Sequence, residues 1–569
     1  MRRLARAGLA ACPVIAIGAA LAAGPAKGQV LPGKADPGRV FEQVPPPPAE
    51  PATAPLVVPE TRPEVPPEGA EELRFRLVGI TLEGNAALAT ADLRALYTDA
   101  LGTEVSLADL YAIAARITAA YRAEGYILSQ ALIPAQRIEG GQATIRVVEG
   151  FVDRVIVDGD DPSGRIAAMG GLIAATRPLT AAALERHLLL IQDLSGVSVR
   201  SVLAPSATVL GAADLTLVVT RNPVEGFFSV DNRGSDTLGP FQIAVGLQIN
   251  DPIGLDGEAG LTLFMTPADD ELYFIRGRIH QPIGHDGLSL NLGASVNWTH
   301  PGADLAPFDN DGRSVALDFG LDYPLVRSRA LSLNLSLGLD WRDTWSDFFV
   351  STARTRVYDD HLRILRAGMR LVAVDGLGGR DTLSLKLEQG LDAFGASKAG
   401  ALDLSRANGK PAFTVIGGDL HRTQPLTEDL ALVTRARFQY AFDPLLASAE
   451  IGFGGNRFGS AFEPSEITGD SGLGGRLEAM WLWALDADEI DATVYGQTYG
   501  FVEGGAIWQR SSPATERRRD SLSSTGLGTR AQLDIGLFGG WEVAFPLHHP
   551  AASAEPGSAR LFFQLGASF

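Results

Sequence analysis

The sequence contains very little cysteine and too few basic residues to balance its acidic ones. Its 569 residues include a single cysteine, Cys12, near the start of the chain. If that segment is removed on secretion, no disulfide, thiolate metal site or cysteine nucleophile can form in the mature chain. Lys and Arg number 48 against 67 Asp and Glu, which gives a net charge of −19. We therefore expect no nucleic-acid partner, because phosphate contacts need Lys and Arg.

Long apolar runs are absent after about residue 25, and the mean hydropathy is only +0.09. A membrane helix needs roughly 20 consecutive apolar residues, so no α-helical membrane protein is expected. A transmembrane β-barrel remains compatible with this composition, because lipid-facing and lumen-facing residues alternate along each of its strands.

Recognisable catalytic patterns are also missing. The sequence has no His-Glu-x-x-His motif, phosphate loop or dinucleotide fingerprint, so we expect no enzyme activity, cofactor or metal. The segment Gly469-Asp470-Ser471-Gly472 resembles the nucleophile segment of trypsin-like proteases, but the order of the eight His residues gives that interpretation no support. We interpret His548-His549 and Arg517-Arg518-Arg519 as exposed loop residues, with lipopolysaccharide contact by the arginines as a weaker alternative.

The N-terminus is typical of a secretory signal over residues 1–28. Arg2, Arg3 and Arg6 precede an apolar run, and Ala26-Lys27-Gly28 offers a cleavage site. Leu9-Ala10-Ala11-Cys12 resembles a lipoprotein box, but the apolar run continues well past the cysteine. Residues 29–72 form a linker with Pro45-Pro46-Pro47-Pro48 at its centre, whose composition favours extended chain. A short helix around 36–43, weakened by Pro37 and Gly38, is a candidate plug.

Residues 73–150 and 151–222 carry the same β-α-β-β order twice, as an internal repeat of about 75 residues. In the first unit we expect strands over 75–82, 126–133 and 143–148, a helix over 88–97, and a second helix capped by Ser106 and ended by Gly125. In the second unit we expect strands over 152–157, 197–203 and 215–219, and one helix capped by Thr180.

Strict alternation of apolar and polar residues begins after residue 222. It is clearest over 288–298, 315–323 and 331–342, runs of about ten residues that match a tilted membrane strand. A soluble β-sandwich also alternates, but its strands usually have about five or six residues. The chain ends on an alternating segment that closes with Phe569. Residues 223–569 therefore predict an all-β transmembrane barrel of about 16 antiparallel strands behind two small α/β domains.

Counting strands back from the C-terminus gives 560–569, 540–547, 525–537, 491–508 and 473–486. Short connections near 486–489 and 538–540 then alternate with longer ones at 509–524 and 548–559. Outer-membrane barrels have short periplasmic turns and long extracellular loops. This parity places residues 442–472 outside the cell.

The first repeat carries a set of motif residues at fairly specific spacing: Tyr121, Gly125, Tyr126, Pro134, Gln136, Glu149 and Gly150. They resemble the signature of the first POTRA domain in TpsB-type transporters of two-partner secretion, the ShlB/FhaC/HecB-like haemolysin secretion/activation family. These are outer-membrane barrels with periplasmic POTRA domains, and the resemblance covers the whole mature chain. The same residues can also serve only to build the POTRA fold, with glycines at turns and aromatic side chains in the core.

The barrel region resembles the same family at a gating loop and at the wall facing it. The loop residues that carry the resemblance are Arg457, Phe458, Ser460, Phe462, Gly469 and Asp470, and the wall residues are Phe501, Glu503 and Gly505. In the family the loop tip has an arginine that pairs with the wall acid. Ser460 stands in its place here. Because a buried lone carboxylate is costly, Glu503 should attract a cation, and Arg457 is our candidate.

The resemblance implies an outer-membrane translocation pore that exports an unfolded secreted partner without ATP. The expected partners are a TpsA-like exoprotein with an N-terminal secretion domain, outer-membrane lipid and lipopolysaccharide, and the barrel assembly machinery. The protein itself is expected to be a monomer with its POTRA domains in the periplasm. An assembly factor that inserts other barrels is the alternative, although such factors usually carry three or more POTRA domains. A passive porin is disfavoured by the POTRA repeat.

Overall fold

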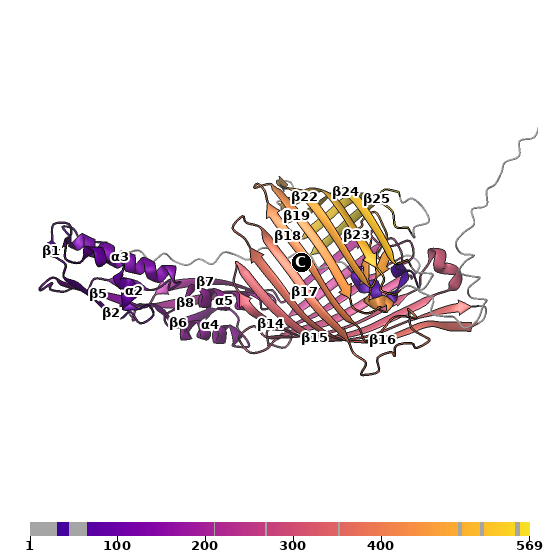
Figure 1. Cartoon of the computed structure of the whole chain (residues 1–569), viewed down its shortest axis with the longest axis horizontal. Coiled ribbons are helices and arrows are strands. Elements are labelled where there is room, and N and C mark those ends of the chain that lie inside the picture. Colours follow the sequence, from indigo (N-terminus) through magenta and orange to yellow (C-terminus); the bar gives the residue numbers. More distant parts are fainter. Residues whose placement is uncertain are drawn as a thin grey trace, which may run out of the picture.

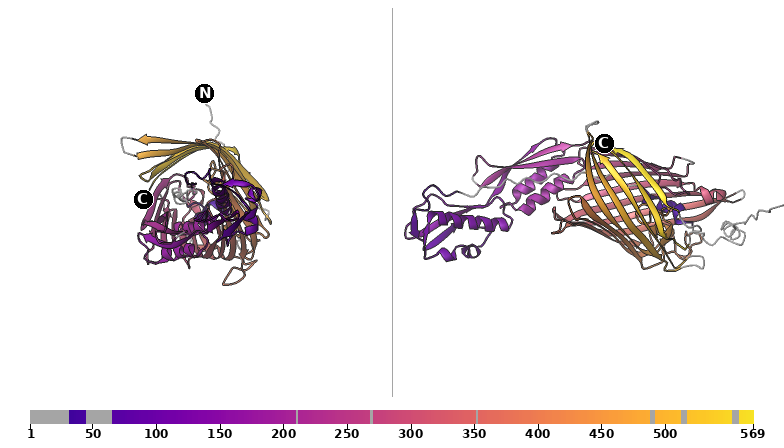
Figure 2. Two further views of the ribbon diagram at one scale, coloured as in Figure 1. Left: turned by 90° about the vertical axis from the view of Figure 1, so that its left-hand side faces the viewer. Right: turned by 90° about the horizontal axis from the view of Figure 1, so that it is seen from above.

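The structure is a computed structural model that describes residues 31–44, 65–209, 211–267, 270–350, 353–487, 492–511, 517–551 and 558–569. The expected signal segment with Cys12 and most of the Pro-rich tract lie outside these residues. Figure 1 shows two small α/β units in a row on one side of a closed barrel, and Figure 2 shows the same row from above. Among the described residues, no helix combines the length and the apolar character that a membrane crossing requires.

The first POTRA unit is a three-stranded sheet covered by one long helix. Its elements are β1 (Arg74–Arg76), β2 (Gly79–Glu83), α2 (Thr90–Arg94), η3 (Thr98–Ala100), β3 (Glu104–Ser106), α3 (Leu107–Ala123), β4 (Gln130–Leu132) and β5 (Gln142–Val148), with sheet order β2-β5-β4. Ser106 caps α3 through a reciprocal capping box with Asp109, as the sequence predicts. The predicted strand over 75–82 is divided, because β1 pairs with β3 whereas β2 pairs with β5.

The second POTRA unit repeats this arrangement with two helices. It comprises β6 (Phe151–Asp158), α4 (Arg165–Ala175), α5 (Ala181–Gln192), β7 (Val197–Pro205) and β8 (Ala212–Arg221), with sheet order β6-β8-β7. Thr180 caps α5 as predicted. The sequence did not reveal α4, because Gly170 and Gly171 interrupt its helical pattern and glycine is a poor helix former. Gly170 lets α4 approach the sheet, since a Cβ there would lie 2.6 Å from Val155 Cγ1.

The barrel has the 16 antiparallel strands that the alternation predicts, and β26 closes it against β9. The strands are β9 (Val224–Asp231), β10 (Gln242–Asn250), β11 (Glu258–Met265), β12 (Leu272–Pro282), β13 (Ser289–Thr299), β14 (Asp311–Arg327), β15 (Leu331–Val350), β16 (Ala353–Val374), β17 (Arg380–Gly390), β18 (Thr414–Pro425), β19 (Leu430–Ala441), β22 (Ser471–Ala487), β23 (Ala492–Trp508), β24 (Arg519–Leu533), β25 (Leu537–His548) and β26 (Arg560–Ser568).

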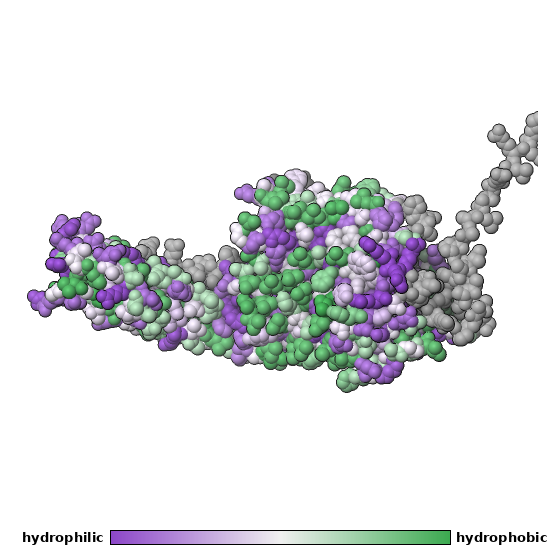
Figure 3. All heavy atoms as spheres, in the orientation of Figure 1, coloured by the Kyte–Doolittle hydropathy of each residue, from purple (hydrophilic) through white to green (hydrophobic). Residues whose placement is uncertain are grey.

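Side chains on the outer face of the barrel are apolar and exposed. Leu335, Leu337 and Leu339 of β15 alternate with Asn334, Ser336 and Gly338, which face the lumen. Figure 3 shows the resulting apolar surface over the barrel strands. Lipid hydrocarbon replaces water outside the barrel, so exposure of these leucines stabilises the inserted state.

From β22 to the C-terminus, the connections alternate in length as the predicted parity requires. One of them is displaced, because the turn between β24 and β25 is Asp534–Gly536 and not the predicted 538–540. Gly536 adopts a φ of +88°, which a tight turn favours, whereas Gly539 and Gly540 are extended strand residues of β25. The loop between β19 and β22 leaves the barrel at the end opposite to the POTRA units.

The second POTRA unit is held on the periplasmic turns of the barrel by charged hydrogen bonds. Asp256, in the turn between β10 and β11, is fully buried and accepts from Ser163 Oγ, from Arg165 Nε at 3.1 Å and from Arg221 Nη2 at 2.7 Å. A second contact joins Arg327 to Asp193 at 2.6 Å. Burial alone would raise the pKa of Asp256, but the hydrogen bonds from Ser163, Arg221 and Arg165 outweigh it and lower the pKa.

Asp256→Asn should loosen this docking. The change removes the charge between two nearly buried arginines, at a cost of about 3 kcal/mol. Spin labels at Ser198→Cys in β7 and Leu377→Cys in an exposed periplasmic turn should then report a broadened distance distribution. Because the folded pKa of Asp256 lies below its ordinary value, the parent distribution should stay narrow at every pH above that value and broaden only as the pH falls through the folded pKa.

Glu83→Gln is the matched control, since Glu83 forms an exposed ion pair with Arg146 within the first POTRA unit. It should leave the distribution unchanged. An unchanged distribution in Asp256→Asn would show that other contacts hold the two parts together.

Candidate functional site: the gating loop, the plug and the barrel wall

A short N-terminal segment lies inside the extracellular half of the barrel. It consists of two 3-10 turns, η1 (Gly33–Ala35) and η2 (Pro37–Glu42), at the position where the sequence allows a short helix. Asp36 caps η2 and also accepts from the hydroxyl of Tyr358 on β16 at 3.1 Å. Val40 is fully buried against inward side chains of β10, β11 and β12. We call residues 31–44 the plug (Figure 1).

The gating loop, residues 442–470, folds back into the lumen. It contains η5 (Ala447–Ala449) and a small hairpin of β20 (Ile451–Phe453) and β21 (Ile467–Gly469). Its apolar side chains pack with inward residues of the wall, including Phe501. The ring of Phe453 lies on Gly474 and Gly505, where a Cβ would come within 2.4 Å of the ring. Gly505 of the predicted wall motif therefore makes room for the loop.

The base of the gating loop is fixed by Asp470, which is fully buried. Its carboxylate accepts from Arg406 Nη1, from the Leu445 amide and from the Arg510 amide, each at 2.7 Å. Arg406 belongs to another extracellular connection, between β17 and β18, so Asp470 joins three separate segments. Asp470, which the sequence assigns to the gating loop, therefore fixes the base of that loop.

The plug and the gating loop are bound directly to each other. Arg39 is 2% exposed and donates from Nη1 to the Glu450 carbonyl at 2.6 Å and from Nε to Ser465 Oγ at 3.2 Å. Lys34 pairs with Glu463 at 2.5 Å. Both contacts join plug residues to loop residues more than 400 positions away in the sequence. The two segments fill the lumen as one unit.

The tip of the gating loop contacts the barrel wall at Ser460, which has no exposed surface. The Ser460 amide donates to Glu503 Oε1 at 2.5 Å, and Arg476 Nη1 donates to Ser460 Oγ at 3.2 Å. Phe458 and Phe462 pack beside it in the same apolar cluster. The sequence motif on the loop and the acid on the wall therefore meet, as the resemblance implies.

The cation beside Glu503 is Arg476 and not Arg457. Arg476 of β22 lies directly opposite Glu503 of β23 in the strand register, and its Nη1 is 3.2 Å from Glu503 Oε2. Arg457 is exposed. Our sequence-based candidate was wrong because it took the arginine nearest to the family position in the sequence. The hairpin register between β22 and β23 carries the signal that identifies Arg476.

Arg476 is the centre of a larger charge cluster in the wall. Its guanidinium also contacts Glu542 at 3.1 Å and Glu478 at 3.2 Å, and it lies 3.7 Å from the centre of the Phe501 ring. Arg530 and Arg233 complete the pairing, at 2.8 Å from Glu478 and 3.3 Å from Glu542. All six charged residues come from barrel strands or the connection after β9. A further arginine, Arg435 of β19, lies directly opposite Arg476 in the strand register. Each of the three carboxylates thus has an arginine partner without any charge from the loop.

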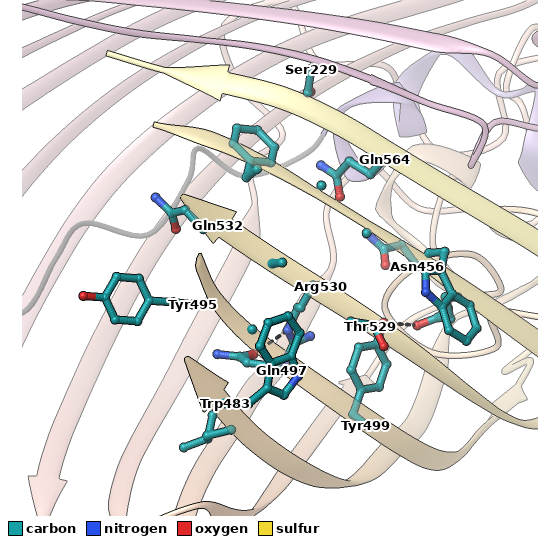
Figure 4. Close-up of a pocket in the computed structure, with 18 of the residues that line it drawn as sticks. Ser229, Asn456, Trp483, Tyr495, Gln497, Tyr499, Thr529, Arg530, Gln532 and Gln564 are labelled. Atoms are coloured by element: carbon teal, nitrogen blue, oxygen red, sulfur yellow. Dashed lines mark hydrogen bonds between the residues drawn. The ribbon is translucent and has the colours of Figure 1, made fainter. Parts of the chain in front are cut away.

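A cavity of about 850 Å³ lies in the lumen next to this cluster, toward the periplasmic turns. Figure 4 shows its lining, in which Gln497, Tyr499, Arg530, Gln532 and Gln564 belong to β23, β24 and β26 and Asn456 to the gating loop. Polar and aromatic side chains alternate around it. The plug and the loop leave this part of the lumen unfilled.

The POTRA signature residues build the first POTRA unit and join it to the second. Tyr121 is buried and donates to Glu149 at 2.8 Å, and burial together with Glu149 raises the pKa of the phenol. Gln136 exchanges two hydrogen bonds with the backbone of Thr144, at 2.6 and 2.7 Å. Leu179 and Ala181 of the second unit donate to the carbonyls of Gly150 and Gly125.

The remaining signature residues complete this account. Tyr126 lies 5.7 Å from Tyr121 between ring centres, and the Pro134 carbonyl accepts from Gln136. At the other end of the chain, Phe569 exchanges two backbone hydrogen bonds with Gly226 across the β26–β9 junction.

The residues of the protease-like segment 469–472 and of the histidine pair at 548–549 make contacts that stabilise the fold. Asp470 fixes the loop base, and Ser471 Oγ accepts from the Ala441 amide at 3.1 Å. The His549 ring lies edge-on to Phe462. Within the described part of the chain, no group of three or more His, Cys, Asp or Glu is placed to hold a metal ion.

Arg476→Gln should destabilise the folded barrel strongly. It removes the cation that pairs with the buried carboxylate of Glu503, and the expected cost is about 3–5 kcal/mol. Samples heated in steps and then run on gels without boiling should lose the band of the folded barrel at a clearly lower temperature. Arg457→Ala, at an exposed loop position, should leave it within the error of the parent. Equal effects of the two variants would contradict the assignment of Arg476.

Comparison with known proteins agrees with this geometry over most of the chain. The family model described as haemolysin secretion/activation protein ShlB/FhaC/HecB matches residues 211–531, and the model of the ShlB-type POTRA domain matches residues 75–150. The outer membrane transporter CdiB of Escherichia coli O6:K15:H31 (strain 536 / UPEC) is 25% identical over 553 residues, 91% of this chain and 86% of that protein.

A further relative matches about half of this chain, and a solved structure has the same fold. The heme/hemopexin transporter protein HuxB of Haemophilus influenzae (strain 86-028NP) is 25% identical over 278 residues, so that match spans 48% of each chain. The solved structure of CdiB from Escherichia coli has the same fold, with a TM-score of 0.72, 21% identity, and coverage of 91% of this chain and 94% of that one. This chain therefore belongs to the haemolysin secretion/activation family ShlB/FhaC/HecB, the outer-membrane β-barrel transporters of two-partner secretion.

Proposed function

We propose that this transporter recognises an unfolded, TpsA-like secreted protein through its POTRA units and exports it through the barrel without ATP. The observation that carries the proposal is the plugged lumen. A polar-lined barrel is filled at rest by two segments that are bound to each other and, through Glu42 and Ser460, to charged residues of the wall. A pore closed by removable segments serves regulated passage of a large substrate, whereas a passive porin needs an open lumen.

Capture of the partner takes place at the edges of the POTRA sheets. The strands β4 and β7 each pair with one neighbour in their sheet, which leaves the other side of the strand for an added strand. Val202 on β7 is 53% exposed and offers an apolar contact beside that edge. An extended peptide can bind there through main-chain hydrogen bonds, with little dependence on its sequence. Arrival of the partner then shifts the population toward a state without plug and loop in the lumen.

The release of the gating loop exposes no unpaired charge in the wall. Arg476, Arg530 and Arg233 stay with Glu478, Glu503 and Glu542 when Ser460 leaves, because the serine contributes no charge to the cluster. At the loop tip, the lost interactions are two hydrogen bonds and the packing of Phe458 and Phe462. The loop is therefore bound strongly enough to close the pore and weakly enough to open it.

Several finer features belong to the same proposal. The protein acts as a monomer, since one chain closes the barrel. The barrel assembly machinery inserts it, with the terminal Phe569 on the last strand, and outer-membrane lipid and lipopolysaccharide surround it. It carries out no enzymatic reaction, uses no cofactor and does not bind nucleic acid.

Deletion of the gene should abolish the appearance of its partner in the culture medium. The partner is sought as a large secreted protein whose reading frame adjoins this one, and its level is measured by immunoblot of medium and periplasm. Plasmid-borne wild-type protein should restore secretion. Continued secretion would contradict the proposal, and a general loss of other barrels from the outer membrane would instead indicate an assembly factor.

Arg39→Ala should open the resting pore. The change removes charged hydrogen bonds between plug and gating loop, each worth about 1.5–3 kcal/mol, so the open fraction should rise about tenfold or more. The open probability in planar lipid bilayers measures it. Arg329→Ala, an exposed arginine in the turn between β14 and β15, is the control and should behave as the parent. Arg39→Ala channels that stay as closed as the parent would show that the plug is held by other contacts.

A further inference from the structure

Arg313, on the outer face of the barrel, has no charged partner among the residues that the structure describes. Arg313 of β14 lies directly opposite Trp298 of β13 and Trp345 of β15, so all three side chains share one face of the sheet. That face is the outer one, because Leu317 and Phe319 in the same alternating set of β14 are 50% and 46% exposed. Arg313 therefore points away from the lumen, toward lipid.

The two tryptophans hold the guanidinium between them. Its central carbon lies 5.3 Å from the ring centre of Trp298 and 5.4 Å from that of Trp345. The Nε atom is buried and has no hydrogen-bond partner. Among the described residues Arg313 forms no ion pair, whereas its neighbours Arg354 and Arg356 are paired with Asp311, Asp347 and Asp359. The clamp fixes a cation whose outer nitrogens remain available.

The height of the clamp matches the headgroup layer of the outer leaflet. On β15 the outward apolar side chains run from Leu331 to Trp341, and about ten residues of tilted strand cross the apolar band. Trp345 lies four residues further toward the extracellular end. Aromatic girdles mark the two membrane interfaces of such barrels. Arg313 thus sits just above the hydrocarbon, where lipid phosphates lie.

An arginine lies over an outward aromatic ring at two more places at this end of the barrel. Arg519 lies over Trp508 at 5.7 Å and Arg510 over Tyr440 at 4.6 Å, and neither arginine has an ion pair within the described residues. Trp508 and Tyr440 are 38% and 48% exposed. In a chain with a net charge of −19, arginines without acidic partners gather over outward aromatic side chains at the extracellular rim.

We propose that Arg313, clamped by Trp298 and Trp345, is a binding site for a phosphate group of lipopolysaccharide. A planar guanidinium presents its donors in a fork that matches phosphate oxygens, and such charge-assisted bonds are strong at a membrane interface. The indole rings orient the guanidinium and contact the first carbons of the acyl chains. This inference rests on the outer-membrane location of the barrel and is independent of the export mechanism.

Native mass spectrometry of the detergent-solubilised full-length mature protein tests the site. The probes are lipid A with both phosphates and the same lipid after enzymatic dephosphorylation. Arg313→Gln should weaken binding of the phosphorylated lipid about tenfold, the value of one charged hydrogen-bonded contact. Arg313→Lys, which keeps the charge, should lose less. Arg329→Gln, at an exposed position of a periplasmic turn, should bind as the parent does.

Each outcome decides the proposal. Folding of every variant is checked by its mobility on unheated gels. Equal binding of phosphorylated and dephosphorylated lipid by the parent would overturn a phosphate site. Parent-like binding by Arg313→Gln, or equal losses in Arg313→Gln and Arg313→Lys, would overturn the role of this arginine. If an Arg313 variant lost secretion but bound the phosphorylated lipid as the parent does, the lipid-site proposal would be overturned and the export proposal would stand.

Discussion

The pairing of Arg476 with Glu503 inside the barrel wall is the constraint on which the closed pore depends. Arg476, Arg530 and Arg233 pair with three buried glutamates of the wall, Glu478, Glu503 and Glu542. A buried carboxylate without a cation would be unstable, so the wall needs these ion pairs in every state of the pore. Because the gating loop adds only the neutral Ser460, its binding and its release leave the charges paired.

The plug depends on the loop more than on the cluster. Arg39 and Lys34 bind loop groups, and the loop in turn is fixed at its base by Asp470 and at its hairpin by Phe453 on two glycines. The second POTRA unit, at the other end of the barrel, is tied to the turns through Asp256. The molecule therefore combines a rigid frame, made of wall and docked POTRA unit, with one removable assembly of plug and loop.

Local sequence signals predicted the frame well and the site only in part. Alternation over 331–342 and similar runs predicted the barrel, and the caps Ser106 and Thr180 predicted two helices, because these signals act over a few residues. Helix α4 was missed since its glycines serve packing against the sheet and hide the helical pattern. The loop tip and Glu503 were predicted to meet, but Arg457 was the wrong cation. Arg476 is near Glu503 only through strand register, which proximity in sequence does not reveal.

The most direct test of this account is a double-mutant cycle between the loop tip and the wall. Ser460→Arg adds a cation to a cluster whose carboxylates already have arginine partners, and Arg476→Ser removes the ion-pair partner of Glu503. Each single variant should therefore lower the temperature at which stepwise-heated samples lose the folded band on gels run without boiling. The double variant places the arginine on the loop and leaves the number of cations at the cluster unchanged. The account predicts that it recovers most of the lost stability. A double variant no more stable than the weaker single variant would contradict the claim that one arginine serves this cluster from the wall.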